Sequence, residues 1–188
     1  MGSLVLTMFM TIDGYTETPD GAMIAPDWSA DLQAHWAGEN AREGTLLLYG
    51  RNSFEYNSQM WPAAAENPSS PDEFRAFAQL MNSLPKAVMS TTLTDVGWNG
   101  RVLKGDVEEA VAGLKKDFDG DIIATGGMRL ARTLLAIDHV DRLRVLVMPR
   151  ISGTGRSIFT TDALPTEFSL IDNQTMDTGA AIVTYQRR

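Results

Sequence analysis

The stretch DIIATGGMRL, residues 121–130, joins a short apolar run, a glycine pair and the first turn of an amphipathic helix. The run Asp121–Ala124 has the length and composition of a buried strand. Apolar residues spaced like one face of a helix follow Gly126-Gly127. A strand that passes into a helix across glycines is typical of α/β proteins, which bind ligands at the carboxyl ends of parallel strands. The stretch therefore favours an α/β fold and marks one corner of a candidate ligand site.

The same pattern of an apolar run followed by small or polar residues occurs earlier in the chain. The run TLLLY at 45–49 leads into Gly50-Arg51-Asn52-Ser53, and the run AVMS leads into two threonines in AVMSTT at 87–92. The run LVLTMFMT at 4–11 is also short and apolar, and the turn-forming pair Asp13-Gly14 follows it. These runs predict further buried strands of the same sheet.

Helical patterns separate the apolar runs. Residues 28–42 predict one helix, and Asp106 opens another. The start Ser70-Pro71-Asp72-Glu73 predicts a third, because Ser70 can cap the helix and Glu73 can close a capping box. The stretch 62–71 is rich in Pro, Ala, Asn and Ser, and it predicts a surface loop.

The pattern changes after residue 140. Residues 143–148, 168–171 and 181–186 are typical of strands, and no helical pattern separates them. Alternating strands and helices predict a parallel sheet, whereas a terminal run of strands predicts antiparallel additions at one edge. We therefore expect a three-layer α/β fold with helices on both faces of a twisted, mostly parallel sheet and antiparallel strands at its C-terminal edge. A single domain over residues 1–188 would form it.

The composition argues against several classes of site. The 188 residues include no cysteine and two histidines, His35 and His139, so we expect no disulfide, no thiol catalysis and no metal site. The net charge of −8 argues against a nucleic-acid partner, because a basic face is needed to neutralise phosphates. Six arginines nevertheless lie within residues 129–156, so an anionic ligand could be attracted locally.

The hydropathy of the chain argues against a membrane partner. No stretch approaches the roughly 20 apolar residues that span a bilayer, and the N-terminus has no basic and apolar regions of an export signal. Because the chain also lacks cysteine, the cytoplasm is the expected compartment.

The strand ends have the chemistry of an anion site. A helix N-terminus presents free N–H groups and a partial positive charge, worth about 0.3–1 kcal/mol to a nearby anion, and glycine lets a phosphate approach the backbone. Gly50 and Gly126-Gly127 could hold a pyrophosphate from two sides, with a charge-assisted contact from Arg51. Ser90-Thr91-Thr92 could bind a 2′-phosphate or a ribose hydroxyl. Taken singly, each piece also fits an ordinary turn or a solvated strand end.

Six segments, in a fixed order over nearly the whole chain, carry a likeness to known enzymes. They are MTIDGY at 10–15, LLYGRNSFE at 47–55, KAVMSTT at 86–92, TGG at 125–127, VDRLR at 140–144, and a loop containing Pro149, Gly153, Gly155 and Phe159. Together they resemble the dihydrofolate reductase superfamily. The closer likeness is to its branch related to the C-terminal reductase domain of the bifunctional riboflavin-biosynthesis deaminase-reductase.

This resemblance implies a dihydrofolate reductase-like fold and NADPH as the cofactor. It places Gly50-Arg51-Asn52-Ser53 at the cofactor phosphates and Ser90-Thr91-Thr92 near the 2′-phosphate. The stretch Gly126-Gly127-Met128-Arg129-Leu130 would hold the pyrophosphate and the nicotinamide side, and the nicotinamide would lie near Met10–Asp13. The resemblance also implies a homodimer formed through the C-terminal strands.

Two carboxylates are candidates for catalysis. Dihydrofolate reductases hold the pterin with one carboxylate early in the first helix, and Asp31 is the nearest match, although an insertion separates it from Gly50-Arg51. Alternatively, Asp31 is a first-turn acid that favours the helix dipole. Asp13 is either a substrate-side acid or the former of a turn. In the catalytic interpretation, Asp13 or Asp31 positions the water that supplies a proton.

Three further residues are candidates for binding the substrate. Trp28 and Trp61 could form aromatic walls for a flat heterocycle, or they could belong to the core. Arg156 could bind a substrate phosphate or lie on a solvated face. For Arg142 and Arg144 we expect ion pairs with nearby acids on a solvated strand face. The phosphoribosyl-binding residues of the riboflavin-pathway reductase have no clear counterpart in this sequence.

The predicted function is that of an NADPH-dependent oxidoreductase, which delivers hydride to a C=N or C=O bond of a small pterin- or pyrimidine-like heterocycle. The cofactor performs the hydride chemistry, so no side chain needs to be a nucleophile. Two alternatives stay open. One is a reductase that binds FMN on the same fold, and the other is a catalytically inactive, ligand-binding homologue.

Overall fold

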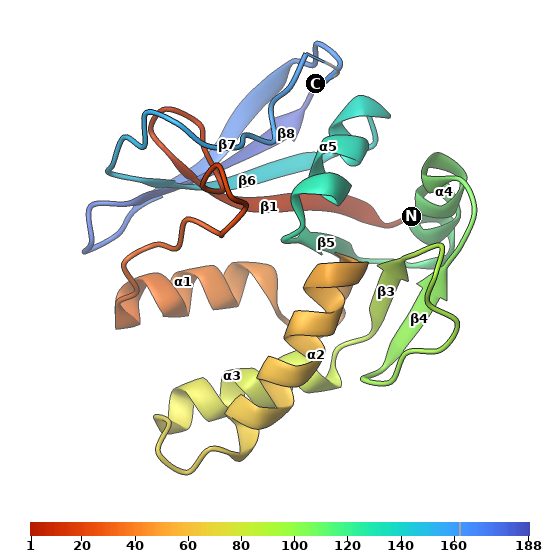
Figure 1. Ribbon diagram of the computed structural model, residues 1–188, viewed down its shortest axis with the longest axis horizontal. Helices are drawn as coiled ribbons and strands as arrows, with labels where there is room; N and C mark the ends of the chain where they lie inside the picture. The colour runs from red at the N-terminus through yellow and green to blue at the C-terminus, as the bar shows by residue number, and fades with distance from the viewer. Residues whose placement is uncertain (162) are drawn as a thin grey trace.

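The computed structural model describes residues 1–161 and 163–188, which build one eight-stranded sheet with helices on both faces (Figure 1). The strands are β1 (Ser3–Thr11), β2 (Leu46–Gly50), β3 (Lys86–Met89), β4 (Gly100–Leu103), β5 (Asp121–Thr125), β6 (Arg142–Met148), β7 (Phe168–Thr175) and β8 (Ala181–Arg187). The helices are α1 (Ala30–Asn40), α2 (Arg51–Glu66), α3 (Asp72–Ser83), α4 (Val107–Asp117) and α5 (Met128–Ala136). Within the two described ranges, no helix is both long enough and apolar enough to cross a membrane.

The strand order in the sheet is β4-β3-β2-β5-β1-β6-β8-β7. The strands from β4 to β6 in this order are parallel to their neighbours, whereas β8 is antiparallel to both β6 and β7. The parallel part arises where strands and helices alternate along the chain, and the antiparallel part arises from the C-terminal strands. The expected sheet is therefore confirmed in both its parallel and its antiparallel parts.

Both faces of the central strands are buried because different helices cover them. Leu4 of β1 packs on the side of α4 and α5, in a core cluster with Val111 and Leu134. Its neighbour Val5 points to the other side, in a cluster with Phe54 of α2. Figure 1 shows α1, α2 and α3 together on this second side. Burial on both faces explains why these strands are continuous apolar runs and do not alternate with polar residues.

The expected surface loop at 62–71 is wrong for its first half, because α2 continues to Glu66 with Pro62 inside it. A proline in a helix interior removes one hydrogen bond and costs about 3 kcal/mol. Packing between helices offsets this cost, because the Trp61 ring contacts Phe74 and Phe77 of α3 at centroid distances of 6.0 and 5.2 Å. Tertiary contact thus keeps α2 helical where the local sequence favours a loop.

Two smaller expectations also need correction. The helix predicted at Ser70 exists, but Pro71 is its N-cap residue and no side chain caps it. The Ser70 carbonyl instead accepts a hydrogen bond from the Arg75 guanidinium at 2.6 Å. The short strand β4 was not expected. It follows Trp98 and Asn99, two residues with positive φ angles of 60° and 52°, and it is recognisable only from its parallel pairing with β3.

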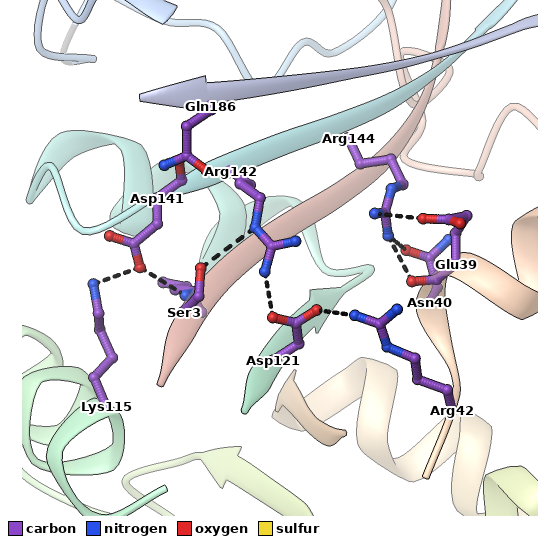
Figure 2. Close-up of polar contacts among 11 residues, drawn as sticks. Ser3, Glu39, Asn40, Arg42, Lys115, Asp121, Asp141, Arg142, Arg144 and Gln186 are labelled. Atoms are coloured by element: carbon purple, nitrogen blue, oxygen red, sulfur yellow. Dashed lines mark hydrogen bonds and ion pairs between the residues drawn. The ribbon is translucent and has the colours of Figure 1, made fainter. Parts of the chain in front are cut away.

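Charged side chains join the amino ends of the central strands to the surrounding elements (Figure 2). Asp121, at the start of β5, forms ion pairs with Arg142 of β6 and with Arg42. Lys115 of α4 lies 2.6 Å from Asp141, which also accepts a hydrogen bond from the backbone of β1. This edge of the sheet is therefore held together by ion pairs between elements far apart in the sequence.

Arg144 of β6 forms a separate set of contacts and is buried, so the expectation of a solvated face is wrong for this residue. Its side chain is only 5% exposed. The guanidinium lies 2.9 Å from the Glu39 carboxylate and also donates to Asn40 Oδ1 and Thr184 Oγ1. Burial lowers the pKa of Arg144, and the Glu39 charge opposes that shift. The expected pairing of Arg142 and Arg144 with acids is confirmed.

Lys86 is a buried cation at the start of β3. Its Nζ donates to the Asn82 carbonyl at 2.9 Å and lies 4.1 Å from the centre of the Trp98 ring. In the part of the chain that the structure describes, no carboxylate forms an ion pair with it. Burial lowers the pKa of Lys86 to about 8. Protonation of Lys86 therefore destabilises the folded state relative to the unfolded state, in which the lysine is hydrated.

We expect the free energy of unfolding to rise between pH 8 and pH 10, because the folded protein releases the Lys86 proton there while the unfolded chain still holds it. At about 1.4 kcal/mol per pKa unit, the rise is on the order of 2–3 kcal/mol. Urea denaturation across this range measures it. Lys86→Met should remove the slope, whereas Lys104→Met, at an exposed lysine, should keep it. An equal slope in wild type and Lys86→Met would contradict the assignment.

Candidate functional site

The candidate site is built where β2 and β5 end side by side. These strands are parallel neighbours with Leu48 paired to Ala124, so both carboxyl ends lie at the same edge of the sheet. The two glycine corners, which we define as Gly50 and Gly126-Gly127, then pack against each other. A β-carbon at Gly127 would lie 3.1 Å from Ser53 Oγ, and one at Gly50 would lie 3.6 Å from Leu130 Cβ. The expected proximity of the corners is confirmed, and their binding role stays a prediction.

Each glycine corner is the N-terminus of a helix without a side-chain cap. Gly50 is the N-cap residue of α2 and Gly127 that of α5, and neither helix has an acidic residue in its first turn. The other helices begin differently, since Ser29 caps α1 and Asp106 caps α4 through their side chains, and the uncapped α3 has two acidic residues in its first turn. In the part of the chain that is described, the first N–H groups of α2 and α5 thus have no side-chain acceptor, and both positive helix ends stay unneutralised.

The Arg51 side chain reaches the third strand end of the site. It is exposed, and its Nη1 lies 3.4 Å from Thr92 Oγ1. Ser90 is buried, and its hydroxyl accepts hydrogen bonds from the backbone N–H groups of Thr92 and Leu93. Ser90 therefore holds the turn, while Thr91 and Thr92 are exposed. The structure brings Arg51 and Thr92 together and leaves Ser90 Oγ occupied within the loop.

The first turn of α5 presents one charged side chain and its backbone. Met128 and Leu130 are buried in the core on the α4 and α5 side, so only their backbone N–H groups can serve a ligand. Arg129 is exposed. Among the described residues, neither Arg129 nor Arg51 has a carboxylate within ion-pair distance. Two free guanidinium groups therefore stand beside the two helix N-termini.

Asp13 holds a loop next to the end of β1. Its carboxylate accepts hydrogen bonds from Thr11 Oγ1 at 2.5 Å and from the backbone N–H groups of Ser152 and Gly153 at 3.1 and 2.7 Å. The hydrogen bond from Thr11 lowers the pKa of Asp13, and the two backbone N–H groups lower it further. These contacts give Asp13 a role in positioning residues 152–153, and its catalytic role stays a prediction.

Asp31 lies in the first turn of α1, as expected, and contacts the turn between β7 and β8. Its Oδ2 accepts from the Asp177 N–H at 3.1 Å, and its Oδ1 lies 3.1 Å from His35 Nδ1. Ser29, the N-cap residue of this helix, donates to the Asp177 carboxylate. These contacts anchor the start of α1, so the structural interpretation of Asp31 has direct support and the catalytic one stays a prediction.

The two candidate tryptophans lie in different places. Trp28 precedes α1 and contacts Phe9 of β1, with a centroid distance of 5.6 Å and rings nearly perpendicular. Trp61 lies between α2 and α3, and its Nε1 donates to Asn57 Oδ1 at 2.8 Å. Since Trp61 is ten residues beyond Arg51, it lies about 15 Å along α2 from the glycine corner. The structure therefore supports a core role for Trp61 and leaves Trp28 near the end of β1.

Arg156 lies on a loop next to the start of α5. Its guanidinium is 3.6 Å from the Glu17 carboxylate, and its backbone pairs with the same residue. Thr16 directly precedes Glu17, and its Oγ1 lies 3.9 Å from Met128 Sδ. Thr16 therefore lies beside the start of α5, Phe9 lies beside Trp28, and neither was expected from the sequence. No local signal indicates either residue, because β1 is buried along nearly its whole length and Thr16 lies in a loop.

The fold and the site together define a class, namely α/β proteins in which parallel strand ends and helix N-termini form an edge suited to phosphate groups. The chain belongs to the RibD C-terminal domain family, because the sequence model of that family matches residues 3–182.

Several known proteins are similar to this chain in sequence or in fold. Uncharacterized protein YyaP of Bacillus subtilis (strain 168) is 24% identical over 182 residues, which are 97% of this chain and 93% of that protein. A putative riboflavin biosynthesis protein from Shewanella sp. PV-4 has a TM-score of 0.69 at 20% identity, with 99% of both chains covered. Dihydrofolate reductase from Enterococcus faecalis, complexed with NADP(H), has a TM-score of 0.58 at 16% identity, covering 99% and 96%. The expected dihydrofolate reductase-like fold is confirmed.

Asp13→Asn tests the loop contact. We expect faster amide hydrogen exchange at Ser152 and Gly153 at neutral pH, because the neutral amide offers these N–H groups a weaker acceptor. Since the pKa of Asp13 is lowered on folding, its stabilising contribution is present at neutral pH and is lost as the pH falls below about 4. Wild-type exchange at these residues, measured by NMR, should then approach that of Asp13→Asn. Equal protection in both proteins at pH 7 would contradict the role.

Proposed function

We propose that this chain, acting as a single domain over residues 1–188, is an NADPH-dependent reductase. In this proposal it delivers hydride to a C=N or C=O bond of a small pterin- or pyrimidine-like heterocycle. The observation that carries the proposal is the contact between the two glycine corners, which presents two uncapped helix N-termini to one ligand. Membership of the RibD C-terminal domain family supports it, as does the fold shared with an NADP(H)-bound dihydrofolate reductase.

Each group at the edge has a part in this proposal. The first turns of α2 and α5 would hold the pyrophosphate through the N–H groups of Gly50–Ser53 and Gly126–Leu130. Arg51 and Thr92, whose side chains already meet, take the 2′-phosphate, with Thr91 on the same turn. Arg129 adds positive charge beside α5. When bound, NADPH supplies the hydride, and the protein orients the nicotinamide near Met10–Asp13.

The proton comes from water in this proposal. Because its pKa is lowered, Asp13 is ionised at neutral pH and accepts hydrogen bonds. It can therefore orient a water molecule but cannot itself donate the proton. Asp31 is the second candidate for this positioning role.

Arg51→Ala tests the 2′-phosphate assignment. We expect the Kd for NADPH to rise about tenfold, a loss of about 1.4 kcal/mol, because one charge-assisted contact is removed. The Kd for NADH, which lacks this phosphate, should change less than twofold. Fluorescence titration measures both, and Arg101→Ala, at another exposed arginine, is the control. An equal loss for NADPH and NADH would remove Arg51 from this role.

Two outcomes would favour the alternatives. Purified protein that is yellow, binds FMN and binds NADPH poorly would support an FMN reductase. Protein that binds NADPH but oxidises it with no pterin, pyrimidine or quinone would support an inactive, ligand-binding homologue.

We also propose that the chain forms a homodimer through β7. This strand is the free edge of the antiparallel part of the sheet, and Leu170 and Ile171 on it are 51% and 54% exposed. An exposed apolar edge strand readily pairs with another chain.

Light scattering after size exclusion tests the dimer. Ile171→Asp should give a monomer at a concentration where wild type is a dimer, because the charge would be buried in the interface. Lys104→Asp, beyond the opposite edge strand, should stay dimeric. A monomeric wild type would overturn the proposal.

A further inference from the structure

Four exposed or half-exposed arginines near the candidate site differ in their ion pairs, whereas Arg132 of α5 donates to the Ser157 carbonyl. Arg51 and Arg129, beside the glycine corners, form no ion pair among the described residues. Arg150 and Arg156 follow β6, on the other side of β1. Arg150 lies 2.9 Å from the Asp27 carboxylate, and Arg156 lies 3.6 Å from that of Glu17. Arg51 and Arg129 are thus available to an anion on the proposed cofactor side, whereas Arg150 and Arg156 are neutralised on the other.

Further acids strengthen this difference. Asp13 is exposed and carries its negative charge at neutral pH. Asp20 is also exposed, and its charge interacts with Arg156, which adds to the lowering of the Asp20 pKa by Thr18. The carboxylates of Asp13 and Asp20 would repel an anionic group that entered this region. Arg150 and Arg156 could not offset this repulsion, because each already forms an ion pair. The region after β1 and β6 is therefore poorly suited to a phosphate.

The same region exposes large apolar side chains. Trp28 is 51% exposed, and the Ile12 and Ile151 side chains are more exposed still. The ion pair between Asp27 and Arg150 brings the residue before Trp28 to the residue before Ile151. The Ile12 N–H donates to the Arg150 carbonyl, which brings Ile12 to the same place. Trp28, Ile12 and Ile151, from three separate segments, thus adjoin the two residues of one ion pair, either along the chain or through a backbone hydrogen bond.

Trp28 is held in place without being covered. Its ring meets Phe9 at 82°, and Phe9 in turn contacts Trp36 of α1 at 4.8 Å between centroids. Phe9 and Trp36 are partly buried against the core cluster around Leu32. A fixed indole with half its surface free is suited to contact a flat ring, since aromatic pairs contribute about 0.5–1.5 kcal/mol beyond burial of their area.

From these observations we propose that the substrate side of this site takes a flat, uncharged ring compound that carries no phosphate or carboxylate, held by apolar contact with Trp28, Ile12 and Ile151. The proposal rests on the reductase function proposed above, which assigns the glycine corners to the cofactor. The charge pattern indicates this class of substrate, because Arg51 and Arg129 lie at the proposed cofactor phosphates, whereas Arg150 and Arg156 are neutralised by Asp27 and Glu17.

A matched pair of probes tests the substrate class. 1-Naphthol and 1-naphthyl phosphate share one flat ring system and differ in the phosphate. Calorimetric titration of each into wild-type protein saturated with NADPH should show 1-naphthol binding at least tenfold more tightly. NADPH binding is titrated first and separately, so loss of the proposed cofactor function is seen independently.

Variants assign the contact to its residues. Trp28→Ala should weaken 1-naphthol at least fivefold and change NADPH binding less than twofold, and Trp28→Phe should restore most of the affinity. Leu164→Ala is the control, because Leu164 is an exposed leucine in another part of the molecule. Thr166, whose hydroxyl contacts the Leu164 carbonyl, also contacts Asp138, which follows α5. Asp27→Ala frees Arg150, so it should raise the affinity for 1-naphthyl phosphate severalfold and leave 1-naphthol unchanged.

Each other result overturns the proposal. If NADPH binds and 1-naphthyl phosphate binds as tightly as 1-naphthol, the substrate class is wrong. If neither probe binds, or if Trp28→Ala leaves 1-naphthol binding unchanged, Trp28 is not the binding surface. If NADPH itself does not bind, the reductase function and the inference that rests on it fail together.

Discussion

The candidate site depends on the parallel pairing of β2 with β5. Because these strands are adjacent and in register, the chain leaves both at the same edge and enters two helices whose N-termini touch. A side chain at Gly127 would press on Ser53 and would have to adopt a positive φ of 85°, so the packing of the corner selects glycine. The same absence of a β-carbon lets a phosphate reach the backbone. Packing and binding therefore impose the same requirement on these residues.

Charge is distributed unequally between the two edges of the sheet. At the amino edge, Asp121, Asp141 and Glu39 neutralise the arginines and the lysine that join the strands (Figure 2). At the carboxyl edge, beside the glycine corners, Arg51 and Arg129 have no such partners among the described residues. A buried ion pair mainly holds elements in place, whereas an unpaired exposed arginine can contribute to binding an anion. Unpaired positive charge is thus present beside both glycine corners.

Much of the fold could be predicted from the sequence because its signals are local. The strand at 121–124 is continuous and apolar because both faces are covered, and Asp106 caps α4 through its own side chain. The predictions failed where distant residues decide the outcome. Residues 62–66 are helical because Trp61 packs on α3, and β4 exists because β3 offers it a partner. Neither contact leaves a periodic pattern in the segment itself.

By itself, the sequence determined the order of strands and helices, the glycines at the strand ends and the likeness to a reductase family, because periodicity, capping and turn formation depend on residues a few positions apart. Only the tertiary structure decided which charged and aromatic residues are free to act. Arg150 is neutralised by Asp27, which lies 123 residues away in the sequence, while Arg51 stays free. Trp61 packs between α2 and α3, whereas Trp28 stays half exposed. Such differences arise from how the elements pack, and contacts of that kind join residues that no local pattern relates.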